Sequence, residues 1–224
     1  MVSFQHKKYS VLYRNGLIIV FLMLFILSLV GQSYNGWKEF NDFLADYQKA
    51  PVTYKNYLCS GHFVQATFEN WESEFLQMAL FVIFTIFLRQ QGSSESKSCD
   101  EPITDAAELK PKKDSPWPVK KGGAWLFLYK HSLSISLLLL YFISFMLHWC
   151  GSWMQYNLEQ ELKHNPMESF FQYGFSSRLW FESFQNWQSE FLSVFAIIFL
   201  SIYLRQMGSS QSKKVNAAHR ETGE

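Results

Sequence analysis

The chain has 224 residues and a formal net charge of +1, from 20 Lys and Arg residues against 19 Asp and Glu residues. A general nucleic-acid binder needs a basic excess to neutralise phosphates, so this balance excludes that class and predicts no nucleic-acid partner. Three cysteines are too few for a scaffold held together by disulfides.

Apolar residues gather in four separate segments. The first, Leu17–Val30, has Ser28 as its one polar side chain and is flanked by Arg14 and Trp37. Segments of this length also occur as core helices, but terminal Trp, Tyr, Lys and Arg residues are typical of a membrane interface. The first segment also fits a signal peptide, yet the same layout recurs in mid-chain, where a signal peptide does not occur. We therefore predict four transmembrane helices, at about residues 17–34, 70–88, 131–149 and 186–204.

The Lys and Arg residues are distributed unevenly between the loops. Fifteen of the 20 lie before the first segment, between the second and third, or after the fourth, including the basic residue that closes each segment. The other five lie in loops 35–67 and 151–183. By the positive-inside rule, both termini and the middle linker are cytoplasmic and the two loops face outward. The sequence thus predicts a multi-pass protein of the plasma membrane, with the lipid bilayer as its partner.

The second half of the chain repeats the first at an offset of 116 residues. Over residues 68–97, 16 of 30 positions are identical to their counterparts at 184–213, without an insertion. Each copy contains two predicted spans, so both copies enter the membrane from the same side, as parallel repeats related by an axis along the membrane normal. We predict a first repeat at 1–97, a cytoplasmic linker at 98–123, a second repeat at 124–213 and a cytoplasmic tail at 214–224.

The segments between the spans differ in character. Trp37, Phe40 and Leu44 recur at helical spacing among charged residues, which predicts an amphipathic helix in the outer interface, with a weaker copy in the second repeat. The linker carries four of the six prolines among charged residues, so we expect it, and the similar tail from Ser209, to be mobile. The predicted fold is an all-α membrane protein of four transmembrane helices, arranged as two parallel helical-hairpin repeats with outward-facing amphipathic helices.

Two sequence motifs occur once in each repeat. Residues 68–76 read FENWESEFL and residues 184–192 read FQNWQSEFL, while 88–97 read LRQQGSSESK and 204–213 read LRQMGSSQSK. Through these motifs the chain resembles an uncharacterised family of bacterial four-span membrane proteins. The resemblance covers nearly the whole chain. The resemblance implies a four-span protein of the bacterial inner membrane, and it implies no activity, substrate or catalytic residue.

One glutamate of each repeat lies within a predicted span. Glu74 and Glu190 each precede the Arg that ends the span by 15 residues, which places their backbone about 22 Å above the cytoplasmic edge. A carboxylate there is costly unless it faces the bundle interior and has a partner. One interpretation is an ion or proton site open to the outside, and the other is a structural hydrogen-bond network that fixes helix register. The neighbouring residues of this candidate ligand or ion site are Asn70, Trp71, Ser73, Gln77, Asn186, Trp187 and Ser189.

Basic residues lie near both ends of the predicted spans. His62 and Arg178 occupy equivalent positions on the outer side and are candidate cationic partners of the two glutamates. Four basic residues lie at the cytoplasmic ends of the predicted spans: Arg14, Lys130, Arg89 and Arg205. We expect them to fix the topology of the chain in the membrane, and the alternative is that they bind anionic lipid headgroups.

Cysteine and histidine residues also meet near the outer face. Cys59 and His62, with His148 and Cys150, make a metal site conceivable. Their counterparts in the other repeat include Phe175 and Gln32 and form no such set, so we predict no metal and no cofactor. Whether Cys59 and Cys150 form a disulfide stays open, as does the oligomeric state.

These features favour a membrane protein that is not an enzyme, because the chain has no nucleophile elbow, metalloprotease helix or phosphate-binding loop. We expect an outward-facing polar site at the paired Glu and Trp motifs, which binds a small ligand, a lipid or a protein partner at the outer face. The alternative is a proton- or cation-coupled transporter that uses Glu74 and Glu190. The lower halves of spans two and four disfavour conduction, because Thr85 and Ser201 are their only polar residues.

Overall fold

The computed structural model of the chain describes residues 10–102 and 110–223. Within these residues the regular elements are all helices, which confirms the predicted all-α fold. The start of the predicted first repeat, residues 103–109 of the predicted linker and the last residue lie outside the described residues.

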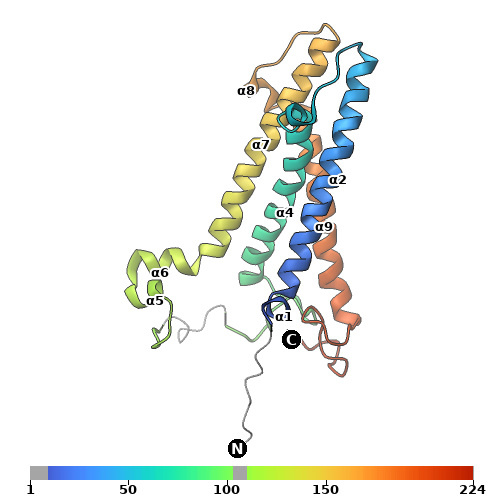
Figure 1. Cartoon of the computed structure of the whole chain (residues 1–224). Helices are drawn as coiled ribbons and strands as arrows, with labels where there is room; N and C mark the ends of the chain where they lie inside the picture. The colour runs from blue at the N-terminus through green and yellow to red at the C-terminus, as the bar shows by residue number, and fades with distance from the viewer. Residues whose placement is uncertain (1–9, 103–109, 224) are drawn as a thin grey trace, which may run out of the picture.

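Four long helices form an elongated bundle (Figure 1). They are α2 (Gly16–Asp46) and α4 (Gly61–Phe87) in the first half, and α7 (Ser132–Leu162) and α9 (Ser177–Tyr203) in the second. Adding 116 to the bounds of α2 and α4 gives those of α7 and α9, so the repeated sequence forms a repeated helical hairpin. The short helices are α1 (Val11–Arg14), α3 (Tyr54–Tyr57), α5 (Trp117–Lys121), α6 (Gly123–Lys130) and α8 (Phe170–Tyr173).

The two hairpins use the same capping residues. Ser60 and Ser176 precede α4 and α9, and each side chain accepts a hydrogen bond from the backbone N–H three residues on, at 3.3 Å. At the other end, Arg89 and Arg205 each donate to the last carbonyls of their own helix, where a cation complements the helix dipole. These shared caps explain why the boundaries of α4 and α9 repeat residue for residue.

Two of these helices, α2 and α7, are long and apolar enough to cross a membrane, by length and composition. Helices α4 and α9 do not reach that hydropathy, because their first halves carry polar and acidic residues such as Glu69, Glu72 and Glu182. The four predicted spans therefore stay a prediction.

The predicted amphipathic helix of the outer interface is not a separate element, and that prediction is wrong. Helix α2 continues unbroken to Asp46, since Gly36 alone does not end a helix. The apolar face of its last turns packs on the following loop, where Phe40 and Leu44 are buried with Tyr57. This outer part is therefore covered by protein, as its counterpart in α7 is.

Helix α4 lies at the centre of the bundle and packs most closely on α7, with α9 as its second neighbour. Two glycines allow this approach: a Cβ on Gly61 would lie 2.5 Å from the amide nitrogen of Gln155, and one on Gly151 would clash with the amide nitrogen of Gln65. The equivalent helices α2 and α9 make few contacts. Ser177 and Asn35 replace the two glycines there, so the packing does not keep the predicted two-fold relation.

The tail from Ser209 folds back onto the first repeat, contrary to the predicted mobile segment. The amide of Gly92 donates to the hydroxyl of Thr222 at 2.9 Å, and the amide of Gly223 donates to the carbonyl of Ser93 at 3.0 Å. The Lys213 side chain is buried and donates to three tail carbonyls. The linker also contains structure, because α5 and α6 pack on each other before α7 begins.

Candidate functional site

The two glutamates predicted as the site do not form a bonded pair. Glu74 is exposed and Glu190 is half-buried, and within the described residues neither carboxylate accepts a hydrogen bond. The polar residues around them are satisfied by their own helices: the side chains of Asn70, Ser73, Asn186 and Ser189 donate to backbone carbonyls three or four residues earlier. Gln77 lines an apolar groove between α4 and α9, of about 410 Å³.

The paired tryptophans have different neighbours. Trp71 packs against Phe25 and Phe68. Trp187 instead donates its indole N–H to Oε1 of Glu72, at 3.2 Å. This hydrogen bond joins α9 to α4. Its acceptor, Glu72, belongs to a second group of polar residues, which is described below.

The predicted cationic partners bind other carboxylates. His62 lies 2.9 Å from Glu39 and 3.2 Å from the hydroxyl of Tyr57. Arg178 binds Glu159 with two hydrogen bonds, of 2.8 and 3.0 Å, and Glu182 with one of 3.0 Å. His62 and Arg178 lie near the N-terminal ends of α4 and α9, several turns away from Glu74 and Glu190. The predicted pairing with those two glutamates is therefore wrong.

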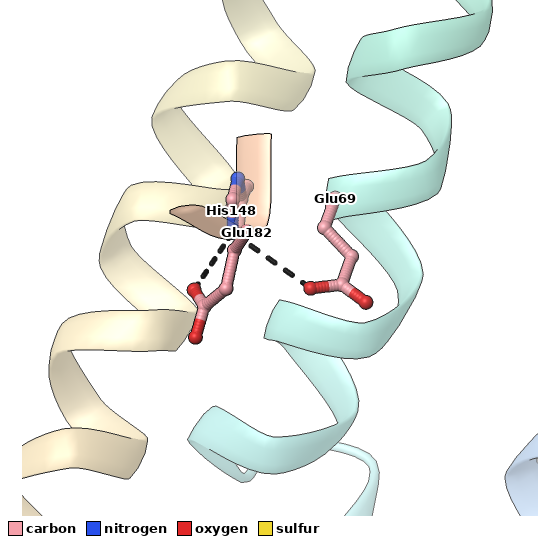
Figure 2. A group of neighbouring side chains, drawn as sticks. All are labelled: Glu69, His148 and Glu182. Atoms are coloured by element: carbon pink, nitrogen blue, oxygen red, sulfur yellow. Dashed lines mark hydrogen bonds and ion pairs between the residues drawn. The ribbon is translucent and has the colours of Figure 1, made fainter. Parts of the chain in front are cut away.

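A fully buried histidine is the centre of the polar group. His148, on α7, has 0% of its side chain exposed. Its Nδ1 lies 3.0 Å from Oε2 of Glu72, and its Nε2 lies 3.2 Å from Oε2 of Glu182 and 3.9 Å from Oε2 of Glu69. Figure 2 shows the contacts of His148 with Glu69, on α4, and with Glu182, on α9, and both contacts are made by Nε2. Three helices thus meet at one imidazole, in what we call the His148 cluster: His148, Glu69, Glu72 and Glu182.

Helical spacing brings these side chains together. On α7, His148 and Ser152 lie on one buried face with Ser144 and Gln155, at intervals of three or four residues. On α4, Glu69 and Glu72 are three residues apart. The small residues of both faces let the helices approach, so the longer His and Glu side chains meet between them.

The cluster carboxylates are held by further hydrogen bonds. Oε2 of Glu182 accepts from the hydroxyl of Ser152 at 2.6 Å, and Ser152 lies 2.6 Å from the hydroxyl of Tyr173. Burial raises the pKa of Tyr173 to about 12, so the phenol stays protonated and donates toward Ser152. Glu72 is fully buried between His148 and Trp187. Each carboxylate therefore has a fixed orientation, apart from that of Glu69.

Arg178 connects the cluster to the outer end of the bundle. The hydrogen bonds that Arg178 donates to Glu159 raise the pKa of Arg178. Burial alone would raise the pKa of Glu159, but the hydrogen bonds and charge of Arg178 outweigh burial and hold that pKa below its usual range. At neutral pH this is a charged, bidentate pair.

A cavity of about 350 Å³ lies beside this pair, between the outer parts of α2, α4, α7 and α9. Glu69 belongs to both the cavity lining and the His148 cluster, so the cavity leads to the cluster. The lining consists of Glu39, Phe43, His62, Gln65, Ala66, Glu69, Gln155, Glu159 and Arg178.

The remaining candidates lie apart from this site. All three cysteines are free, so Cys59 and Cys150 do not form a disulfide. Arg14 and Lys130 lie on the surface where α2 and α7 begin, and the Lys130 ammonium lies over the ring of Phe127. Arg89 and Arg205 bind their own helix ends, as described above.

The sequence did contain a signal for the His148 cluster. Glu69 and Glu72 lie within the repeated motif, but their counterparts are Gln185 and Gln188. Similarly, Gln32 stands opposite His148 and Ala66 opposite Glu182. The cluster lies at positions where the two repeats differ in charge. The predicted site was instead built on Glu74 and Glu190, the glutamates that the two repeats share.

Over residues 10–102 and 110–223, the fold is all-helical, with two helices that could span a membrane and one buried ionic cluster. Comparison with known proteins adds a family: a model described as "Domain of unknown function (DUF6766)" matches residues 8–224. The chain belongs to this family. No curated protein and no solved structure matches the chain.

Proposed function

We propose that the chain is a four-span plasma-membrane protein with cytoplasmic termini, which binds a small cation in its outward-facing acidic cavity and is not an enzyme. The bacterial inner membrane is the location we propose. The proposal has two parts, the topology and the binding site, and separate observations support them.

The directions of the long helices support four spans. Helices α2 and α7 run in the same direction, and α1 lies at the same end of the bundle as the segment that follows α9 (Figure 1). If both helices cross the membrane, the chain between them must cross back. Within the described part of residues 47–131, α4 is the one long helix available for this crossing. After α7, α9 returns the chain to the end of the bundle where the tail contacts Gly92, which makes α9 the fourth crossing.

The surface of the cytoplasmic half also supports membrane insertion. Phe84 and Phe87 on α4, and Phe195 and Phe199 on α9, are exposed. Below them, the rings of Trp117 and Trp125 pack edge to face in α5 and α6 with the Lys121 ammonium over both. Aromatic and cationic residues of this kind are typical of the membrane interface.

Two native cysteines can test the topology. Cys59 precedes α4 and Cys99 follows it, and both are exposed. In intact cells, we expect a membrane-impermeant maleimide to label a variant that retains only Cys59, whereas a variant with only Cys99 needs permeabilised cells. If α4 does not cross the membrane, both variants label from the same side, which would contradict four spans.

The observation that carries the binding proposal is the position of Glu69. Its side chain lies at the cavity wall, 23% exposed, and among the described residues its nearest cation is His148, at 3.9 Å. The other acidic residues of the lining, Glu39 and Glu159, are paired with His62 and Arg178. A cation that enters the cavity therefore meets one carboxylate that lacks a close partner.

We favour binding over conduction because, among the described residues, the cytoplasmic halves of α4 and α9 offer no series of free polar groups. The hydroxyl of Thr85 donates to carbonyls of its own helix, and that of Ser201 donates to Ile198 and contacts Ser93. The groove between α4 and α9 at this level is lined mainly by Leu, Ile, Val and Phe side chains.

A titration of the purified protein in detergent tests the proposal. We expect Zn²⁺, Ca²⁺ or the diamine putrescine to raise the thermal unfolding midpoint saturably, because a ligand that binds only the folded state stabilises it. Glu69→Gln should weaken that binding at least tenfold. Glu74→Gln, on the same helix but outside the cavity, is the matched control and should leave it unchanged. No saturable shift with any probe, or equal binding by Glu69→Gln, would refute a cation site in the cavity.

A further inference from the structure

We infer that the His148 cluster is a site for a first-row divalent transition-metal ion, ligated by His148 Nε2 and the carboxylates of Glu69 and Glu182. This inference rests on the proposed cation binding and names the cation class and its ligands. It departs from our expectation from the sequence, which included no metal.

The spacing of the three ligand atoms fits one ion. All three lie within 4.8 Å of one another, and Nε2 is 3.2 and 3.9 Å from the two carboxylate oxygens. Ligand atoms bonded to zinc at about 2.0–2.2 Å are roughly 3–3.6 Å apart. Glu69 would need the largest shift, and it is the ligand at the cavity wall, where its carboxylate has room to move.

The ring of His148 is oriented as a metal ligand requires. Its Nδ1 faces the carboxylate of Glu72, itself fully buried and fixed by the indole of Trp187. A metal-binding histidine commonly donates its second N–H to a carboxylate in this way, which sets the tautomer and makes the free nitrogen more basic. Glu72 is therefore a positioning residue, and Nε2 is the nitrogen left for the ion.

The charges around the cluster also favour a dication. Glu69, Glu72 and Glu182 surround His148. Glu159 lies farther from His148, on the other side of Arg178, and forms an ion pair with it. Four carboxylates thus face two cationic side chains, even when the imidazole carries its second proton. A divalent ion that displaces that proton from Nε2 brings the group closer to neutrality.

The donor set selects the class of metal. An imidazole nitrogen suits zinc, iron and the other late first-row ions, while carboxylates alone suit calcium and magnesium. Cys150 is the cysteine nearest to His148 in sequence, but its sulfur does not belong to the group of ligand atoms formed by Glu69, His148 and Glu182. We therefore do not expect an ion that prefers thiolate ligands. Three protein ligands leave a coordination position toward the cavity, through which the ion or a further ligand can approach.

Cobalt(II) provides a direct test with the wild-type protein. We expect full-length protein in detergent, stripped with a chelator and titrated with Co²⁺, to bind one ion per chain with visible d–d absorption bands. Zn²⁺ should displace Co²⁺, and millimolar Ca²⁺ should not. X-ray absorption of the zinc form should show one imidazole, oxygen ligands and no sulfur. Absence of Co²⁺ binding, or a spectrum without imidazole or with sulfur, overturns the metal site.

Variants that take the residue of the other repeat assign the ligands. His148→Gln and Glu69→Gln introduce the side chains that Gln32 and Gln185 provide at the equivalent positions. We expect His148→Gln to abolish the cobalt bands and Glu72→Gln to weaken Co²⁺ binding 10- to 100-fold, as loss of an orienting carboxylate does.

His164→Gln, which removes an exposed histidine outside the cavity and takes the residue of the other repeat, Gln48, is the control and should retain the cobalt bands. Unchanged Co²⁺ binding by folded His148→Gln, or its loss in His164→Gln, would overturn the assignment. If Ca²⁺ or putrescine binds through Glu69 while Co²⁺ does not bind, the metal site fails and the proposed cation binding stands. If none of these cations binds, both fail.

Discussion

Replacing Gly151 by leucine should prevent α4 and α7 from packing and lower stability by about 3 kcal/mol or more. A Cβ at Gly151 would meet backbone atoms, the carbonyl carbon of Val64 at 2.9 Å and the amide nitrogen of Gln65. Extra methylene groups in a packed interior typically cost about 1–3 kcal/mol, and backbone cannot move aside as a flexible side chain can. We expect most of the variant to elute as aggregate after extraction in detergent, and the remainder to unfold at a clearly lower temperature.

Gly31→Leu is the matched control for this prediction. Gly31 lies on α2, and a Cβ there would have no neighbour within 4 Å. Its elution profile and unfolding midpoint should stay close to those of the wild type. A Gly151→Leu protein as stable as the Gly31→Leu protein would mean that the close approach of α4 and α7 is not required for the fold.

The sequence predicted the helical hairpins well, since their signals are local. The duplicated motifs and the apolar segments located the cytoplasmic ends of α2, α4, α7 and α9 within one residue, whereas the outer ends of these helices extend 9 to 13 residues beyond the predicted spans. Ser60 and Ser176 cap the second helix of each hairpin. The error at residues 37–47 arose because an amphipathic pattern shows that a face is buried, and not whether lipid or protein buries it. Here the following loop covers that face.

The packing of the bundle could not be predicted from the repeats in the same way. Equivalent sequences suggested equivalent interfaces, but Gly61 and Gly151 occur on one pair of helices and not on the other. Two missing side chains decide which helices come into backbone contact. The single copy of the His148 cluster follows, because α4 and α7 carry both the glycines and the acidic and imidazole side chains.

Removal of the Glu72 carboxylate by Glu72→Ala should cost about 3–5 kcal/mol. Truncating one partner of a buried ion pair leaves the other charge without compensation, and that penalty exceeds the strength of the pair itself. The change would leave His148 Nδ1 and the indole N–H of Trp187 without their shared acceptor. We expect a large drop in the unfolding midpoint of the purified protein, whereas Glu74→Ala, two residues along the same helix and exposed, should change it little.

A double variant separates the cost of an unpaired charge from a need for the cluster itself. In Glu72→Leu with His148→Leu both charged partners are removed together, and apolar residues of similar volume can fill the space. If the cluster has a purely structural role, the double variant should recover most of the stability that Glu72→Ala loses. A protein that regains stability in this way but loses the cobalt bands would show that the helices can pack without the carboxylate–histidine pair. The pair would then be present because an ion binds there, at a cost in stability that apolar packing would avoid. Failure of the double variant to recover would instead mean that these polar contacts fix the register of α4 against α7.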